Sequence, residues 1–172
     1  MWCIFPLIWQ RGRLVTPLKN GSADKSASSS YRPINLLPTL GKILERLLVN
    51  KIEKHTENDL ENTQHGFRKN RGTEGCITKG VKSINKMRKS GPYTAAVFVD
   101  IQGAFDHLLW KHILSSLTEY KVPAYLSSLL GSYFRSRRVT YGDSTRVITR
   151  GCPQGSIIGP LLWNIGYNCV LT

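Results

Sequence analysis

The stretch VFVDIQGAFD, residues 97–106, sets an apolar run directly against a carboxylate. The run ends on Asp100, and an aromatic side chain, Phe105, follows five residues later. With the preceding residues it reads TAAVFVD, which predicts a strand buried on both faces and central in a sheet. A carboxylate at the end of such a strand suits a functional site, and its charge needs a partner such as a divalent metal. An aspartate that only caps a turn is the alternative, and position alone leaves both open.

The charge balance of the chain predicts a polyanionic partner. The 172 residues are 41% hydrophobic, which is enough for one ordinary core or two small lobes. Lys and Arg number 24 against 11 Asp and Glu, so the formal net charge is +13. Basic side chains gain free energy by releasing counterions from phosphates, so we expect nucleic acid. A merely soluble basic protein has the same balance, and charge says nothing about chemistry.

The sequence predicts no cysteine-based zinc or redox site and no membrane or secretory location. No pair of the four cysteines has CxxC spacing, so neither a zinc site nor a redox motif is indicated. No apolar run approaches the ~20 residues that span a bilayer. The start, MWCIFPLIW, has no basic region before its apolar residues, so we expect no secretory signal and no membrane partner. The nucleus or the cytoplasm is the expected compartment.

Periodicity and turn signals predict an α/β chain. We expect a strand over 11–19, a polar loop over 20–30, a helix after Pro38, a basic loop over 64–73, a weaker helix ending at Gly91, the strand over 94–100, helices over 108–120 and from Pro123, a hairpin over 137–149 that turns at Gly142-Asp143, and a helix after a glycine-rich turn at 151–155.

Four local expectations concern helix faces and caps. In the helix after Pro38 the apolar stripe is expected at Leu40, Ile43, Leu44, Leu47, Leu48 and Ile52. Glu45 is expected to face water together with the lysines of that helix. Asp106 is expected to cap the helix over 108–120, and Ser156 is expected to cap the last helix, with Pro160 in its first turn.

Four sequence blocks together resemble the reverse transcriptases of LINE-type (non-LTR) retrotransposons. VFVDIQGAFD resembles their motif A, and GCPQGSIIGPLLWN, residues 151–164, resembles motif B. YRPINLL, residues 31–37, and QHGFRKNRGT, residues 64–73, resemble two finger motifs. The blocks occur in family order at family-like spacing and, with FPLIW and LGKILERLL, cover essentially the whole chain.

The resemblance implies a polymerase centre around Asp100. It implies that Asp100 binds two catalytic Mg²⁺ ions and that the backbone carbonyl of Ile101 completes one coordination shell. Phe105 would be a steric gate whose ring fills the space of a ribose 2′-hydroxyl. Simple core packing is the alternative for Phe105, and the two are compatible.

The resemblance also implies contacts to the nucleotide and to the template. Lys19 and Arg32 fall where the family grips the incoming triphosphate, although a solvated loop lysine is the alternative for Lys19. Gln154 would lie beside the nascent base pair, and Gly155 would let the backbone approach closely. A turn residue at a helix start is the alternative for Gln154. Template contacts are expected at Arg68, Lys69 and Arg71, where an ordinary solvated basic loop is the alternative.

The resemblance ends before one family block. The aspartate pair of motif C does not follow Asn164 in this sequence. We therefore expect a right-hand polymerase of the reverse transcriptase type, with fingers at 1–93 and an incomplete palm at 94–172. The complete enzyme would extend a DNA primer on an RNA template from dNTPs, and these 172 residues alone would be inactive. No stable protein partner is inferred.

Three rival functions stay open at this point. A catalytically dead nucleic-acid-binding remnant would keep the charge and lose the chemistry. A group II intron maturase-type reverse transcriptase would share the fold and the motifs. A polymerase that makes RNA is disfavoured by the aromatic residue at Phe105.

Overall fold

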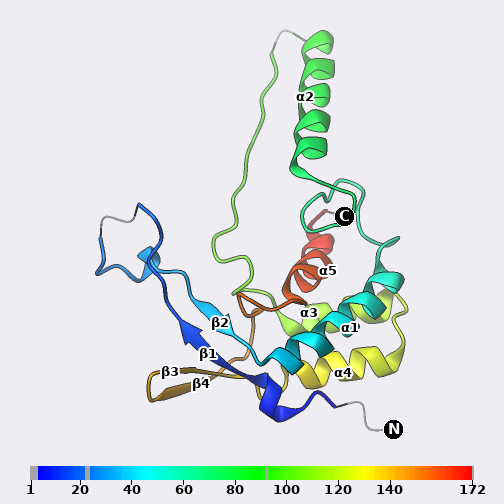
Figure 1. Ribbon diagram of the computed structural model, residues 1–172. Coiled ribbons are helices and arrows are strands. Elements are labelled where there is room, and N and C mark those ends of the chain that lie inside the picture. The colour runs from blue at the N-terminus through cyan, green and yellow to red at the C-terminus, as the bar shows by residue number, and fades with distance from the viewer. Residues whose placement is uncertain (1–3, 22–23, 92, 172) are drawn as a thin grey trace.

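The computed structural model describes residues 4–21, 24–91 and 93–171 as a mixed α/β chain (Figure 1). Its strands are β1 (Arg11–Val15), β2 (Ile34–Leu36), β3 (Arg138–Tyr141) and β4 (Ser144–Val147). Its α-helices are α1 (Thr39–Thr56), α2 (Thr73–Ser90), α3 (Trp110–Glu119), α4 (Ala124–Phe134) and α5 (Gly159–Leu171). Two short 3-10 turns, η1 (Leu7–Gln10) and η2 (Ser28–Ser30), accompany them. The predicted α/β class is confirmed.

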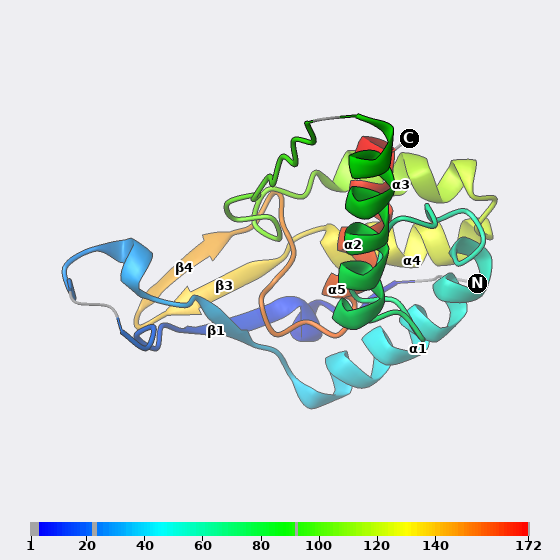
Figure 2. The ribbon, with the colours of Figure 1, turned by 90° about the horizontal axis from the view of Figure 1, so that it is seen from above.

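The four strands form one mixed sheet in the order β2-β1-β3-β4. β1 pairs antiparallel with β2 and parallel with β3, and β3 and β4 form the predicted antiparallel hairpin. Gly142 at the tip of the hairpin has φ +54°, a left-handed conformation that suits glycine. Figure 2 shows the sheet on one side of the molecule and the helices on the other.

The hydrophobic core lies among the helices. α3 packs against α4 and α5, and α1 packs against the same two helices. The most deeply buried apolar side chains of these helices are Leu48, Ile52, Ile113, Leu117, Leu126, Leu130, Leu162 and Ile165. Burying one such side chain contributes about 1.5–3 kcal/mol. The sheet and the core draw elements from both sides of residue 93, and the division into 1–93 and 94–172 stays a prediction.

The buried face of α1 differs from the predicted stripe. Leu40, Ile43 and Leu47 are exposed, whereas the buried positions are Gly41, Glu45, Leu48, Val49, Ile52 and Thr56. Gly41 lies against Trp9, where an added Cβ would come 3.1 Å from the tryptophan Cβ. The helix is therefore turned toward η1 and carries a carboxylate into the interior, so the prediction that Glu45 faces water was wrong.

The apolar run before Asp100 is not a strand in this structure. The described residues of 93–100 carry no regular secondary structure. Val97, Phe98 and Val99 are 87%, 92% and 83% exposed. A central strand needs a hydrogen-bonded neighbour on each side, and no described strand pairs with this segment. The prediction of a buried strand was wrong for the part of the chain that the structure describes.

The helix before that segment, α2, also lies outside the hydrophobic core. Ile77, Val81 and Ile84 of α2 recur at helical spacing, yet no residue of this helix is buried. In Figure 1, α2 extends away from the other helices. The helix forms as predicted, but Ile77 and Val81 on its apolar side are exposed, and Ile84 is half-buried.

One predicted cap is confirmed and one is wrong. The backbone N–H of Gly159, at the start of α5, donates to the Ser156 hydroxyl at 3.2 Å, and Pro160 lies in the first turn. α3 instead begins after Leu109, which makes no side-chain cap bond. The backbone N–H of Asp106 donates to the carbonyl of Gly103, so Asp106 lies in a separate turn ahead of the helix.

Candidate functional site

Three segments that are far apart in the sequence are joined by backbone hydrogen bonds. The N–H of Asn35 in β2 donates to the carbonyl of Gln154 at 2.8 Å. The N–H of Cys152 donates to the carbonyl of Phe105 at 2.8 Å. The N–H of Gly151 donates to the carbonyl of Leu108 at 2.7 Å. The loop at 151–158 is therefore bonded on one side to the strand that follows Arg32 and on the other to the segment that carries Phe105.

Two glycines make this close docking possible. Gly155 has φ +109°, and a Cβ there would lie 2.8 Å from the carbonyl oxygen of Asn35. Gly151 has φ +80°, and a Cβ there would lie 2.6 Å from the carbonyl oxygen of Asp106. Both positions need a left-handed backbone and tolerate no side chain, so glycine is required at each.

Phe105 lies between two other aromatic rings. Its centroid is 5.8 Å from that of Phe67 in an edge-on arrangement and 5.9 Å from that of Trp163 in α5. The ring is partly buried and packs against the hydrophobic core. The packing role weighed for Phe105 is therefore present, and it leaves part of the ring accessible.

A cleft of about 380 Å³ opens where the three segments meet the sheet. Its polar lining includes Asn35, Asp106, Arg150 and Gln154, and its apolar lining includes Leu14 and Val139. The side-chain oxygen Oδ1 of Asn35 is buried and has no hydrogen-bond partner among the described residues. The cleft thus offers donors, acceptors and an apolar wall beside Gln154.

Lys19 and Arg32 lie on neighbouring stretches beyond the β1–β2 ladder. Leu18 and Tyr31 form an isolated antiparallel bridge, and the N–H of Arg32 donates to the carbonyl of Pro17 at 2.9 Å. Both cationic side chains are exposed. The Lys19 Nζ donates to the carbonyl of Ser29 at 2.7 Å. Two predicted anion contacts therefore share one end of the sheet.

The described residues do not form a two-metal centre. Asp100 and Ile101 are both exposed and supply at most one carboxylate and one backbone carbonyl. No group of three or more His, Cys, Asp or Glu side chains that could hold a metal occurs in the part of the chain that the structure describes. Mg²⁺ requires near-octahedral oxygen ligands, so these residues alone do not fit the predicted pair of ions.

The three predicted template contacts have different surroundings. Arg68 is buried, and its guanidinium donates to the carbonyls of Leu60 and Glu61 and to the Glu57 carboxylate, which lies 3.0 Å away. Arg71 donates to Asn62 at 2.6 and 2.9 Å. Lys69 is exposed. Arg68 therefore holds its own loop together, whereas Lys69 has its charge in solvent.

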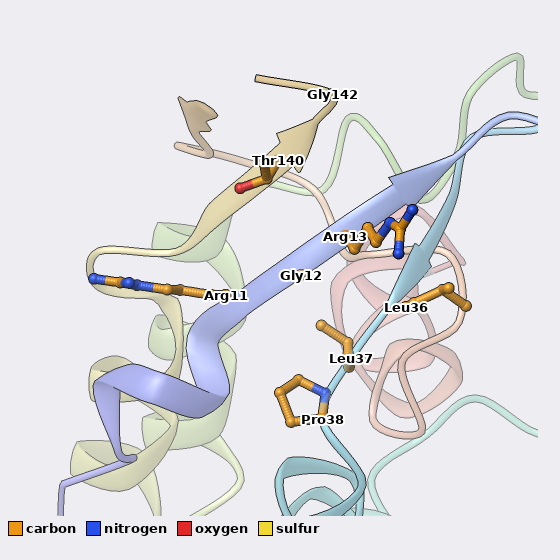
Figure 3. Close-up of a pocket in the computed structure, with 8 residues that line it drawn as sticks. All are labelled: Arg11, Gly12, Arg13, Leu36, Leu37, Pro38, Thr140 and Gly142. Atoms are coloured by element: carbon orange, nitrogen blue, oxygen red, sulfur yellow. The ribbon is translucent and has the colours of Figure 1, made fainter. Parts of the chain in front are cut away.

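A basic sheet face was missed by the sequence interpretation. Arg11 of β1 is the register partner of Arg138 in β3, and Arg13 is the partner of Thr140. Alternate residues of a strand share a face, so the three arginines lie on one side of the sheet. A hollow of about 580 Å³ opens on this side against Leu36, Leu37 and Pro38 (Figure 3). The alternation of arginines at 11 and 13 was the available signal.

A buried carboxylate was missed as well. Glu45 is 1% exposed and accepts hydrogen bonds from the Tyr133 hydroxyl at 2.8 Å and from the backbone N–H of Ile157 at 2.7 Å. Burial raises the pKa of the Tyr133 hydroxyl well above its ordinary range, so it stays a neutral donor. Burial likewise raises the pKa of the neighbouring Cys152 thiol to about 12. Gly41, Glu45, Leu48 and Ile52 recur at helical spacing, and that period was the available signal.

The chain is similar in sequence to reverse transcriptases. Residues 19–172 match the family described as Reverse transcriptase (RNA-dependent DNA polymerase). A putative 115 kDa protein in type-1 retrotransposable element R1DM of Drosophila melanogaster is 37% identical over 165 residues, which are 94% of this chain and 16% of that protein. A probable RNA-directed DNA polymerase from transposon BS of the same species is 36% identical, over 94% of this chain and 18% of that protein.

A third relative gives the same result. The RNA-directed DNA polymerase from mobile element jockey of Drosophila melanogaster is 32% identical, again over 94% of this chain and 18% of that protein. The chain thus spans about a sixth of the length of these curated relatives. The predicted resemblance to non-LTR retrotransposon polymerases is confirmed. Among the described helices none is long and apolar enough to cross a membrane, and the compartment stays a prediction.

Proposed function

The chain belongs to the reverse transcriptase family, and we propose that it forms the nucleotide-selecting part of an RNA-directed DNA polymerase of a non-LTR retrotransposon. The observation that carries this proposal is the joining of β2, the Phe105 segment and the 151–158 loop by backbone hydrogen bonds. A nucleotide presents a triphosphate, a sugar and a base, and each needs its own contact. The three joined segments carry one candidate for each.

The contacts are assigned by the chemistry of the side chains. Lys19 and Arg32 are exposed cations on adjoining stretches and are proposed to bind the triphosphate, with the guanidinium as the bidentate group. Phe105 is proposed to contact the sugar with the accessible part of its packed ring. Gln154, held against β2 through its own carbonyl, is proposed to lie beside the base pair, with Gly155 allowing close approach.

The metal site is proposed only in part. Asp100 is proposed as one carboxylate of the metal site and the Ile101 carbonyl as one further ligand. Further carboxylates are needed for two Mg²⁺ ions, and the described residues do not supply them. The right-hand arrangement, with fingers at 1–93 and a palm from residue 94, is proposed on the same family grounds.

The nucleic-acid partners follow from exposed positive charge. We propose an RNA template paired with a DNA primer as the bound duplex. Lys69 and Arg71 lead into α2, where all of the lysines and the arginine are exposed. The arginines of the sheet face, Arg11, Arg13 and Arg138, add a second basic area. A nucleic-acid-binding remnant without chemistry is not favoured by the relatives, and neither is an intron maturase.

The assignments are tested in a chimaera in which residues 1–164 precede the downstream polymerase region of a non-LTR relative. Arg32→Ala and Gln154→Ala are expected to raise the dNTP KM about tenfold or more, because each removes an exposed side chain that is proposed to bind the nucleotide directly. Asn50→Ala, an exposed change on α1, is the matched control. A dNTP KM that both variants leave at the control value would contradict the assignments.

A further inference from the structure

We propose that Glu45 is the positioning residue that holds the Gln154 loop in its working conformation, an inference that rests on the proposed nucleotide contact of Gln154. Its two carboxylate oxygens connect α1 to the turn before α5 and to α4. Oε2 accepts the backbone N–H of Ile157 at 2.7 Å and the Ser156 hydroxyl at 3.3 Å. Oε1 accepts the Tyr133 hydroxyl at 2.8 Å.

The burial of this carboxylate makes its bonds strong and their loss costly. Glu45 is 1% exposed, so water does not replace any donor that is removed. The donors come from α4 and from the turn before α5, whereas the acceptor comes from α1. Glu45 of α1 thus holds the 151–158 loop against α1 and α4. A negative charge is also favoured at this place, because it faces the N-terminal end of α5.

A second buried ionic group stands behind the same ring. Arg137 is also 1% exposed, and its guanidinium carbon lies 4.1 Å from the centroid of the Tyr133 ring. Its two terminal nitrogens have no hydrogen-bond partner among the described residues. Tyr133 therefore contacts a cation at the face of its ring and a carboxylate at its hydroxyl.

The geometry connects Glu45 to Gln154 through very few bonds. Ile157 and Ser156 follow Gln154 by three and two residues. Ser156 also caps α5 by accepting the N–H of Gly159. In the N-terminal half of the same loop, the carbonyl of Gln154 accepts the N–H of Asn35. Glu45 therefore fixes the C-terminal half of the loop, and β2 fixes the half that carries Gln154.

The first test measures amide hydrogen exchange in the 172-residue chain. Glu45→Ala is expected to speed exchange of the Ile157 amide about tenfold or more, because the N–H loses a buried charged acceptor. Glu45→Gln keeps one acceptor oxygen for that N–H and is expected to have a smaller effect. Tyr133→Phe leaves the acceptor of the Ile157 N–H in place and removes only a donor to the other Glu45 oxygen, so it is expected to speed exchange least of the three. Glu53→Ala, an exposed change on the same helix, is the matched control.

The second test separates positioning from stability. In the primer-extending chimaera, Glu45→Gln is expected to raise the dNTP KM several-fold more than it lowers kcat, and Glu53→Ala is expected to change neither. Unchanged exchange at Ile157 in both Glu45→Gln and Tyr133→Phe would overturn the inference, even if Glu45→Ala fails to fold. Faster exchange with an unchanged dNTP KM would support the anchoring by Glu45 and overturn the proposed nucleotide contact of Gln154.

Discussion

The backbone N–H of Asn35 lies 2.8 Å from the carbonyl oxygen of Gln154, and this bond joins the strand after Arg32 to the loop before α5. The two residues are separated by most of the chain, so the bond exists only in the folded state. It leaves no room for a side chain at Gly155, whose added Cβ would meet the Asn35 carbonyl at 2.8 Å. The docking of the 151–158 loop on β2 therefore depends on this backbone contact and on the glycine at position 155.

Gly155→Ala is expected to destabilise the chain by about 1–3 kcal/mol, because alanine at φ +109° is strained and its Cβ clashes. The midpoint of urea unfolding measures the change. Gly80→Ala is the control, since it lies in α2 with open space around it and is expected to stabilise by about 0.5–1 kcal/mol. Equal midpoints for Gly155→Ala and the parent chain would contradict the docked loop.

Phe105→Ala in the primer-extending chimaera is expected to admit ribonucleotides while much of the dNTP activity remains, because it removes the ring that we propose fills the space of a 2′-hydroxyl. Phe105→Tyr is expected to be mild. The ratio of ribonucleotide to deoxyribonucleotide incorporation measures the effect. Leu117→Ala, a buried change in α3, is the control. If both alanine variants shift the ratio equally, Phe105 serves packing alone.

Cys152 is expected to resist alkylation at pH 8, because burial raises the pKa of its thiol to about 12 and leaves almost no thiolate. Cys76 and Cys169 are exposed and are expected to react first. The folded chain holds the Cys152 proton more tightly than the unfolded chain does, because the pKa is raised from 9.0 to about 12. This contribution to the free energy of unfolding is fully present below pH 9.0 and is lost as the pH rises from 9.0 toward 12. Peptide mass spectrometry after iodoacetamide treatment measures reactivity, and modification of Cys152 as fast as Cys76 would be the contrary result.

Binding of single-stranded nucleic acid is expected to weaken steeply with salt and to show little sequence preference. Log affinity falls as log salt rises, and the steepness of this fall measures how many phosphates are neutralised. Replacing Lys79, Lys82, Lys86 and Lys89 of α2 by Gln is expected to reduce the steepness by about 0.7 for each phosphate that is no longer neutralised. Fluorescence anisotropy at several salt concentrations measures the slope. Lys51→Gln with Lys54→Gln, both exposed on α1, is the control. A slope that the α2 variant leaves unaltered would exclude α2 from the interface.

Local signals predicted the elements well, and long-range partners decided the rest. The hairpin at Gly142 and the cap by Ser156 depend on neighbours within a few residues, and both were predicted. The burial of Glu45 depends on Tyr133 and Ile157, which lie 88 and 112 residues away, so the periodicity of the apolar residues alone placed this carboxylate on the solvent face. The run before Asp100 has the composition of a buried strand, but burial requires neighbouring strands that composition does not reveal.

The motifs supplied candidate site residues, and the structure shows which of their segments meet. Gln154 and Phe105 were identified from separate blocks, and the structure connects their segments through the 151–158 loop. Arginine is a common phosphate contact, yet the guanidinium of Arg68 donates to the Glu57 carboxylate and to the carbonyls of Leu60 and Glu61. Sequence does not distinguish a solvated arginine from a buried one, because the distinction depends on how the surrounding loop closes.

The most direct test of the central claim is RNA-templated primer extension by the chimaera that contains residues 1–164. We predict dNTP incorporation on an RNA template, loss of that incorporation in Asp100→Asn with nucleic-acid binding retained, and no extension by the 172 residues alone. Extension that Asp100→Asn leaves intact, or extension by the 172 residues alone after purification controls, would contradict the claim.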